Sequence, residues 1–297
     1  LRTRRQRQMC IRDRLPENTD TVIRYEDVEV NTLMATVTID AIKEGQNIHY
    51  QGSDKEQGTV LIKKNTIISP AEIGVLATVG KSNVKVAKQP KVMIVSTGDE
   101  LVGVEETPLA HQIRRSNVYT LVSLLERLKI PSETAHLTDE KEVLKEKIIG
   151  YLKEYDALLF SGAVSKGKFD FLPEVLDELG VEKLFHKVAQ RPGKPFWSGV
   201  TENCNVFAFP GNPVSTFVNG MAYFYPWYYK SVGVVQKTET AVLAEDVTFR
   251  PNLTYFLQVK LSVDNSEFKA TPVKANGSGD LASLVCLLYT SDAADES

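Results

Sequence analysis

Apolar residues between positions 90 and 233 form short continuous runs, each followed by a polar loop and then by a stretch with helical periodicity. A run without alternation, such as 92–95, is typical of a strand that is covered on both faces. Strand, loop and helix in this repeated order predict a doubly wound α/β domain with a mostly parallel sheet. The expected strands are 92–95, 133–137, 157–160 and 206–209, and the expected helices are 117–129, 139–152, 171–180 and 213–229.

Short β-branched runs separated by turns flank this region on both sides. Before it, they predict small antiparallel sheets and one helix over 69–80, with Ser69 as N-cap and Pro70 at the first helical position. We expect that helix to pack on those sheets. The expected organisation is a β-rich N-terminal region over 15–89, an α/β domain over 90–233 and a small β domain over 234–285, with both flanking domains incomplete.

The two ends differ in composition from the rest of the chain. Residues 1–14 hold six arginines and one aspartate without periodicity, and residues 286–297 are equally unlike what precedes them. We expect both to be non-native or disordered tails. A basic arm for nucleic acid or a transit peptide is the alternative for the first. Without the tails, the 35 basic and 38 acidic residues become 29 and 34, so the net charge falls from −3 to −5.

The composition, with 42% hydrophobic and 25% charged residues in 297, is that of a globular protein. Its near-neutral charge argues against a nucleic-acid partner, and no apolar run reaches the roughly 18 residues that cross a membrane. Cys10, Cys204 and Cys286 are odd in number and far apart, so a disulfide framework is not expected. We expect a cytoplasmic protein that binds a small molecule.

Three of the expected strands end in glycine-containing loops, at 96–100, 161–167 and 210–213. Ligands of an open parallel sheet bind outside the carboxyl ends of its strands, so we expect these loops to share one rim and to cradle phosphate. Alternatively, each is only a tight turn between strand and helix. The candidate binding residues are Thr97, Gly98, Asp99, Ser161, Gly162, Ser165, Pro210, Gly211, Asn212 and Pro213.

Charged side chains of both signs accompany the loops. Carboxylates beside bound phosphates favour Mg²⁺, although Asp99 and Asp139 are also placed to cap helices. Asp170 is the strongest candidate, because it stands between two phenylalanines, where a charge needs a reason. Basic residues suit phosphate, unless they form a solvated turn. The carboxylates are Asp99, Glu100, Asp139 and Asp170, and the cations are Lys187, Arg191 and Lys194.

Other catalytic patterns are absent from the sequence or incomplete in it. Segment 162–169 approaches the nucleotide-binding pattern G-x-x-x-x-G-K-[ST], but Phe169 lacks the hydroxyl that binds Mg²⁺. No cysteine pair has zinc spacing, and there is no G-x-S-x-G nucleophile elbow. A nucleoside triphosphatase is therefore not expected.

Eight segments carry a family resemblance. In chain order they are LPENTDTVIRYEDV (15–28), NIHYQGSD (47–54), VSTGDEL (95–101), QIRRSN (112–117), SGAVSKGKFDF (161–171), KVAQRPGKPF (187–196), FPGNPVS (209–215) and GSGDLASL (277–284). Together they resemble the molybdopterin molybdenumtransferases, a family that includes bacterial MoeA proteins and the gephyrin E domain.

The resemblance implies a transferase that inserts molybdate into adenylylated molybdopterin and releases AMP with Mg²⁺, the last step of molybdenum cofactor biosynthesis. It implies roles for the acidic residues Glu100, Asp139 and Asp170, with Asp170 and Glu100 holding Mg²⁺, and for Pro210 and Pro213. It also implies a homodimer of the full-length protein and contact with the adenylyltransferase of the same pathway.

Two features depart from the family pattern. Ala163 stands where a second glycine is usual, and residues 1–14 replace a Thr-Gly-Ala segment of the N-terminal region that helps to build the dimer. We therefore expect this chain to dimerise poorly and to have low activity. The alternatives are the related molybdopterin adenylyltransferase, which lacks the flanking β segments, and a non-catalytic pterin-binding scaffold.

Overall fold

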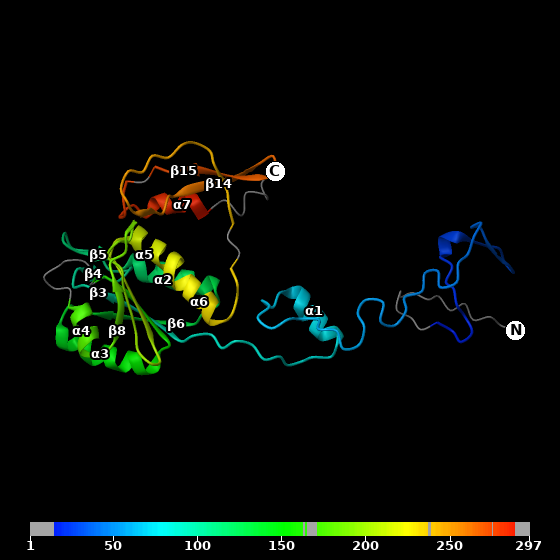
Figure 1. Cartoon of the computed structure of the whole chain (residues 1–297), viewed down its shortest axis with the longest axis horizontal. Helices are drawn as coiled ribbons and strands as arrows, with labels where there is room; N and C mark the ends of the chain where they lie inside the picture. Colours follow the sequence, from blue (N-terminus) through cyan, green and yellow to red (C-terminus); the bar gives the residue numbers. More distant parts are fainter. Residues whose placement is uncertain (1–14, 163, 165–170, 237–238, 275, 289–297) are drawn as a thin grey trace. The chain divides into compact units, whose positions relative to one another are not determined.

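The structure is a computed structural model that describes residues 15–162, 164, 171–236, 239–274 and 276–288 (Figure 1). It divides into two compact units, Leu1–Val79 and Gly80–Ser297. Residues 1–14 and 289–297, which belong to the two expected tails, lie outside the described residues. None of the described helices has the length and apolar character needed to span a bilayer.

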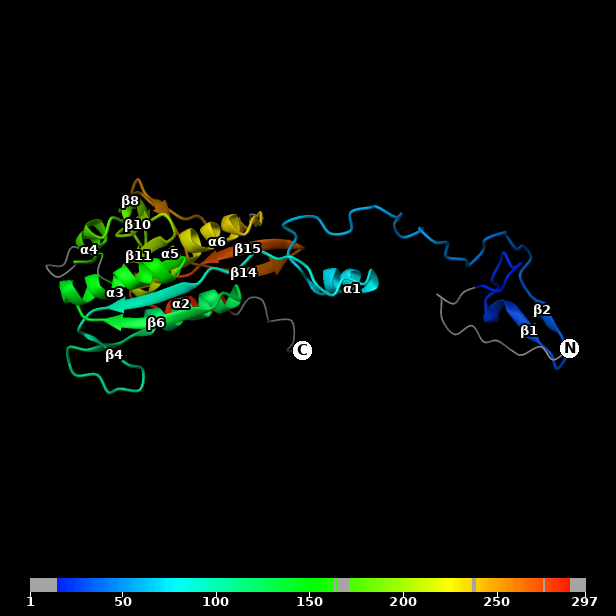
Figure 2. The ribbon, with the colours of Figure 1, turned by 90° about the horizontal axis from the view of Figure 1, so that it is seen from below.

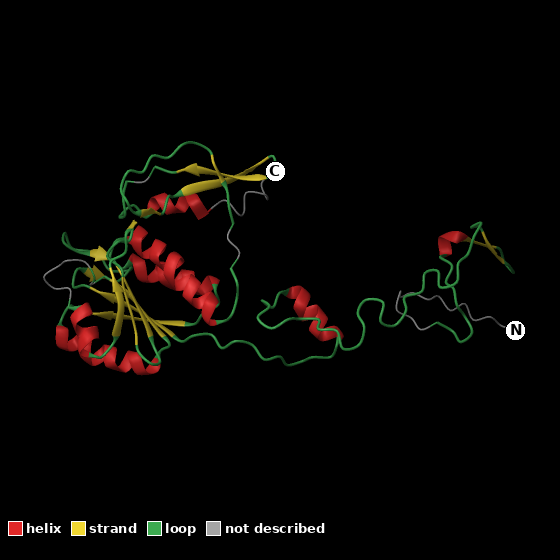
Figure 3. Ribbon diagram, viewed as in Figure 1, coloured by secondary structure: helices red, strands yellow, loops and turns green. Residues whose placement is uncertain are grey.

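The N-terminal unit contains little regular structure (Figure 3). A 3-10 turn, Tyr25–Asp27, leads into β1 (Val28–Val30), which pairs antiparallel with β2 (Ala35–Val37). The expected helix is present as α1 (Pro70–Thr78). Its N-terminus is a capping box, in which the Ser69 hydroxyl accepts from the Ala71 N–H and the Glu72 carboxylate accepts from the Ser69 N–H.

None of the described side chains of this unit is buried. The expectation that α1 packs on a sheet is therefore wrong, because the helix covers no buried residue of the unit. Most of the expected small sheets are also missing, and β1–β2 is the single ladder among residues 15–79. Short apolar runs predict strands only where a partner strand completes the hydrogen bonds.

A six-stranded sheet forms the centre of the second unit, in the order β6-β3-β7-β11-β10-β8. The first four strands run parallel, and β10 runs antiparallel to both of its neighbours, β11 and β8, so the expected doubly wound, mostly parallel α/β fold is confirmed. The strands are β3 (Val92–Thr97), β6 (Ser132–Leu137), β7 (Ala157–Ser161), β8 (Glu182–His186), β10 (Trp197–Val200) and β11 (Asn205–Phe209).

The four parallel strands are the ones that the sequence pattern predicts, whereas β8 and β10 escape prediction. β8 lies at the edge of the sheet and leaves four of its five residues exposed, so it lacks an apolar run. β10 contains Gly199, and its pairing with β8 shifts register between Ser198 and Gly199. β10 is buried over its first three residues, but the sequence there, Trp-Ser-Gly, is not an apolar run.

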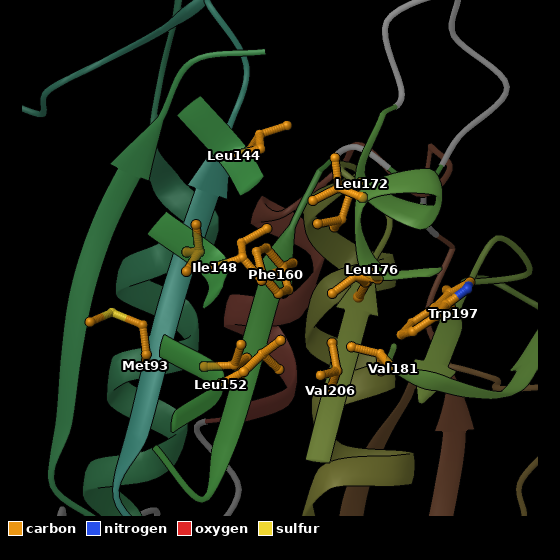
Figure 4. Close-up of a cluster of buried hydrophobic side chains, with 14 of the residues drawn as sticks. Met93, Leu144, Ile148, Leu152, Phe160, Leu172, Leu176, Val181, Trp197 and Val206 are labelled. Atoms are coloured by element: carbon orange, nitrogen blue, oxygen red, sulfur yellow. The ribbon is translucent and has the colours of Figure 1, made fainter. Parts of the chain in front are cut away.

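Helices cover both faces of the sheet (Figure 1). α3 (Lys141–Glu154) and α4 (Leu172–Glu178) lie on one face, where their apolar side chains pack around Phe160 (Figure 4). α2 (Ser116–Arg127), α5 (Pro213–Asn219) and α6 (Tyr225–Ser231) lie on the other face. Every residue of β3 and β7 is buried between these layers.

The last helix of the α/β part is interrupted. A continuous helix over 213–229 is predicted, but a π-helical turn, Gly220–Phe224, separates α5 from α6. There the Tyr225 N–H donates to the Gly220 carbonyl, five residues back. Pro226 follows directly and has no N–H to continue the ordinary ladder, so the wider turn stands where an α-helical bond is missing.

The C-terminal segment forms a small three-stranded sheet in the order β12-β15-β14. β14 (Val259–Asp264) and β15 (Glu267–Pro272) form an antiparallel hairpin (Figure 2), and β12 (Val242–Leu243) pairs parallel to β15. α7 (Ala282–Leu288) packs beside β14. Two further short pairs join β4 (Leu101–Val102) to β5 (Ile113–Arg114), and β9 (Gln190–Arg191) to β13 (Thr254–Tyr255).

Two neighbouring residues of α3 test the core. Ile148 is fully buried in the cluster of Figure 4, whereas Ile149 is 45% exposed. We expect Ile148→Ala to lower the free energy of unfolding by about 2–5 kcal/mol, because it leaves a cavity, and Ile149→Ala to change it by under about 1 kcal/mol. Both tryptophans lie in this unit, so urea unfolding followed by their fluorescence measures it directly. Equal losses in the two variants would contradict this packing.

Candidate functional site

The carboxyl ends of β3, β7 and β11 meet at one edge of the sheet. Ser96 and Phe209 both pair with Ser161 of the central strand β7, so the three strands end level with one another. The Gly162 N–H then donates to the Phe209 carbonyl at 3.1 Å. The structure thus brings the three glycine loops to a shared rim.

Gly162 permits a close contact between two backbone segments of this rim. Its φ is +109°, and a Cβ at this position would lie 2.9 Å from the Thr97 carbonyl oxygen. Only glycine fits both the backbone conformation and the space. The same hypothetical atom would lie 3.0 Å from Thr97 Oγ1, a buried hydroxyl oxygen with no hydrogen-bond partner among the described residues.

Pro210, Gly211 and Pro213 complete the rim. A Cβ on Gly211 would lie 3.9 Å from Gly162 Cα, so the third loop runs beside the second. Pro213 opens α5, and the Pro210 carbonyl accepts from the buried Thr216 hydroxyl at 2.7 Å. Both prolines therefore lie in a loop that is anchored to the first turn of its own helix.

Asn117 is a residue of this rim that the sequence analysis did not single out. It lies in the first turn of α2, and its Nδ2 donates to Ser161 Oγ at 2.9 Å and to the Gly211 carbonyl at 2.7 Å. The available sequence signal was its place in the QIRRSN segment, at the start of the helix that follows the first glycine loop.

The carboxylates of the described loops are partly brought together. Asp99 Oδ1 accepts from the Asp139 N–H at 3.3 Å, which joins the ends of β3 and β6. The Glu100 carboxylate lies beside Gly98, where a Cβ would be 2.5 Å from Glu100 Oε2. Helix capping does not explain Asp99, because the helix that follows it along the chain, α2, begins only after Arg115. Asp170, Ser165 and Ala163 lie outside the described residues.

His136 stands at the end of β6, next to this carboxylate group. Its Nδ1 lies 3.0 Å from Ser96 Oγ. Burial and the charge of Arg115 lower the pKa of His136, and Asp99 and Glu100 only partly oppose this shift. The surroundings of His136 therefore disfavour its protonated form.

A second group of candidate residues lies on the turn 190–195. Beneath this turn is a network of buried amides, in which Gln190 Nε2 donates to Asn219 Oδ1 at 2.7 Å and Asn219 Nδ2 donates to the Gly193 carbonyl at 3.2 Å. The Tyr223 hydroxyl donates to Gln190 Oε1. A Cβ on Gly193 would lie 2.5 Å from Asn219 Oδ1, so the turn rests directly on the network.

The turn forms one wall of a cavity of about 540 Å³. Arg191 and Lys194 line it together with Asn212 of the third glycine loop, and the opposite wall belongs to the C-terminal segment, including Tyr255 and Ser278. Asn212 Nδ2 donates to Ser278 Oγ at 2.9 Å. Two of the described lining residues are cationic and none is acidic, so the cavity suits an anion.

Lys187 is not among the residues that line the cavity. Its backbone has a φ of +71°, and its N–H donates to the Phe196 carbonyl at 2.7 Å. The structure therefore groups Arg191 and Lys194 with Asn212, and places Lys187 at the base of the turn. Within the described ranges, no three histidine, cysteine, aspartate or glutamate side chains form a ready-made metal cluster.

Three family models match consecutive parts of the chain. The MoeA N-terminal region (domain I and II) matches residues 13–80, the probable molybdopterin binding domain matches 93–227, and the MoeA C-terminal region (domain IV) matches 240–286. Together these matches cover most of the sequence.

Curated proteins and solved structures agree with these models. A molybdopterin molybdenumtransferase of Synechocystis is 38% identical over 278 residues, which are 91% of this chain and 68% of that protein. One from Staphylococcus aureus is 30% identical and covers 91% and 65%. The crystal structure of a molybdopterin biosynthesis MoeA protein from Pyrococcus horikoshii matches with a TM-score of 0.74 and 29% identity, over 92% of this chain and 67% of that one. The chain spans about two thirds of the length of these relatives.

The low pKa of His136 makes stability depend on pH. Because the folded protein disfavours the protonated imidazole, the unfolded chain takes up the proton first, and the free energy of unfolding falls as pH drops below 6.5. We expect His136→Gln to lose this part of the dependence when urea unfolding at about pH 7.5 and about pH 5.5 is compared. His186→Gln, at an exposed position of β8, is the control and should keep it. If His136→Gln retained the full slope, the assignment would fail.

Proposed function

The chain belongs to the MoeA family of molybdopterin molybdenumtransferases, transferases of molybdenum cofactor biosynthesis, and from this premise we propose that it inserts molybdate into adenylylated molybdopterin with Mg²⁺-dependent release of AMP. One observation carries the proposal: a rim of three glycine loops continues, through Asn212, into a cavity with two cations and no acidic residue among its described lining. Both substrates are anions, which such a surface attracts.

The rim suits the phosphate end of the pterin substrate. Gly162 and Gly211 let the backbone approach a ligand closely, and Thr97 leaves a buried hydroxyl oxygen to be satisfied by it. The proposed contacts include Thr97, Gly98, Asp99, Ser161, Gly162 and Ser165. Pro210 and Pro213 restrict the third loop, so less reorganisation is needed when the anion arrives.

Glu100 and Asp170 are the proposed ligands of Mg²⁺, with Asp139 as a further catalytic carboxylate. Mg²⁺ usually keeps several waters and takes only one or two protein carboxylates besides substrate phosphates, so a complete protein cage is not required. The contact of Asp99 with the Asp139 N–H gathers acidic groups at this end of the rim, which supports the assignment. Bound Mg²⁺ supplies positive charge that stabilises the negative charge developing on the leaving phosphate.

Arg191 and Lys194 are proposed to hold a tetrahedral oxyanion in the cavity, either molybdate or a substrate phosphate, with Lys187 adding charge from the base of the turn. Arginine can donate two parallel hydrogen bonds to such a group, while lysine acts as a point charge. The buried amides of Gln190 and Asn219 support this role, because they keep the turn in one shape before the anion binds.

The N-terminal unit supports a further proposal, that the full-length protein acts as a homodimer. None of its described side chains is buried, and apolar residues such as Leu33 (96% exposed) and Met34 (70% exposed) are open to solvent. Exposed apolar surface of this kind marks an interaction site. We also propose that the chain is organised in three domains, over residues 15–89, 90–233 and 234–285. The protein is proposed to act in the cytoplasm and to receive its substrate from the adenylyltransferase of the same pathway.

The first experiment follows AMP release from adenylylated molybdopterin with molybdate and Mg²⁺. We expect AMP release that depends on molybdate. Asp170→Asn should reduce its rate by about 100-fold or more, because a neutral amide binds Mg²⁺ more weakly than a carboxylate does. Asp177→Asn, an exposed change on α4, is the control. Tight binding without release would instead identify a scaffold, and adenylylation of molybdopterin by ATP would identify the related enzyme.

The second experiment tests the cavity with Lys194→Met, which keeps the length of the side chain and removes its charge. We expect KM for molybdate to rise about tenfold while kcat stays within about twofold, as for a group that contributes to ground-state binding. A rise in KM for adenylylated molybdopterin alone would assign the cavity to phosphate. Lys183→Met, on the exposed strand β8, serves as the control. Unchanged KM for both substrates would remove the cavity from the site.

A further inference from the structure

Asn117 joins two loops that are far apart in sequence. It lies on α2, which packs beside α5 on one face of the sheet (Figure 1). One hydrogen atom of its Nδ2 is donated to Ser161 Oγ, at the end of β7, and the other to the Gly211 carbonyl, after β11. The amide therefore stands between the second and third glycine loops.

The orientation of this amide follows from its partners. The Gly211 carbonyl oxygen can only accept a hydrogen bond, so the nitrogen and not the oxygen of the Asn117 side chain must face it. The remaining atom, Asn117 Oδ1, is buried and has no hydrogen-bond partner among the described residues. Thr97 Oγ1, the other such atom on this rim, borders the neighbouring residue Gly162.

Helix capping does not account for this arrangement. The N-cap residue of α2 is Arg115, which makes no side-chain capping bond, and Asn117 Oδ1, the atom of this side chain that could accept from the helix N–H groups, has no partner among the described residues. Apart from the two bonds that Asn117 donates, the described loops are joined by the Gly162 N–H to the Phe209 carbonyl. Asn117 of α2 thus supplies the side-chain hydrogen bonds that join the second and third glycine loops.

Unsatisfied buried oxygens indicate a bound partner: the Thr97 hydroxyl can donate to an anion, whereas Asn117 Oδ1 can only accept, from a water or from a donor group of the ligand. Leaving a buried acceptor without a donor is unfavourable, and such atoms in folded proteins are commonly satisfied by a bound molecule or an ordered water. Two of them on one rim, beside Ser161 and beside Gly162, indicate that the space between the loops holds a bound molecule or an ordered water.

We propose that Asn117 is a positioning residue that couples the Ser161–Gly162 loop to the Gly211 loop, so that both present their backbone to the bound anion in one fixed arrangement. The coupling of the two loops does not depend on the proposed function of the protein. The effect on ligand binding rests on that proposed function.

Hydrogen exchange of the full chain tests the coupling. In Asn117→Leu, which has a similar size and no donor, we expect backbone exchange over 157–162 and 206–214 to rise roughly tenfold, while exchange over α3 stays unchanged. The matched control is Asn205→Leu, at the opposite end of β11, which should leave both loops as they were. Unchanged exchange in either loop, or an equal rise throughout the domain, would overturn the proposal.

Asn117→Asp distinguishes the hydrogen bond from simple packing. The ionised carboxylate cannot donate to the Gly211 carbonyl, but the protonated form can, so the protection lost at about pH 7 should return as the pH is lowered through the ordinary aspartate pKa of about 3.9, to about pH 3.3. Protection is compared with that of the unmodified protein and of Asn205→Asp at each pH. A loss that does not recover on protonation would mean that the side chain only fills space, and the proposal would be wrong.

The ligand part uses AMP as the probe, measured by calorimetry with Mg²⁺ at about pH 7.5. We expect Asn117→Asp to raise Kd for AMP by about tenfold or more, since it both releases the Gly211 loop and adds a negative charge, and Asn205→Asp to leave Kd unchanged. Absence of AMP binding to the unmodified protein would count against the proposed function and not against the coupling. Equal AMP affinity of Asn117→Asp and the unmodified protein would show that the coupling does not position the ligand.

Discussion

Parallel pairing of β3, β7 and β11 is the constraint on which the rest of the structure depends. Helices cover both faces of this sheet, so every residue of β3 and β7 is buried. Polar residues of these strands are therefore placed at their carboxyl ends. Ser96, Thr97 and Ser161 are the first polar residues after long apolar runs, and they lie at that edge. Because parallel strands end on the same side, three short loops meet there, each from a different part of the chain.

Neutral amide side chains hold the segments that the sheet brings together. Asn117 ties two glycine loops, while Gln190 and Asn219 support the turn that carries Arg191 and Lys194. An amide offers both donors and an acceptor without charge, so it can be buried against carbonyl groups at a smaller desolvation cost than an ion. The charged side chains of Arg191 and Lys194 stay exposed.

The two units differ in how they are stabilised. The second unit has two apolar clusters, one on each face of its sheet. The described part of the first unit buries no side chain. Its helix α1 has nine residues, none of them buried, and is stabilised at its N-terminus by a capping box. Isolated helices of this length are marginal in water, so the unit depends on interactions that its own described residues do not supply.

The sequence by itself determined the four parallel strands, the helices between them, the three glycine loops at one rim and the family. It could do so because continuous apolar runs and 3.6-residue periodicity report burial directly, and because glycine marks each loop. It did not predict β8 and β10, whose exposed or glycine-containing residues carry no such pattern. Only the tertiary structure decided that Asn117 joins two of the glycine loops, that Gln190 and Asn219 lie beneath the turn 190–195, and that Arg191 and Lys194 line a cavity while Lys187 does not. These assignments rest on contacts between residues that lie far apart in the chain, such as Asn117 and Gly211, and local sequence patterns do not encode which distant backbone atom a side chain meets.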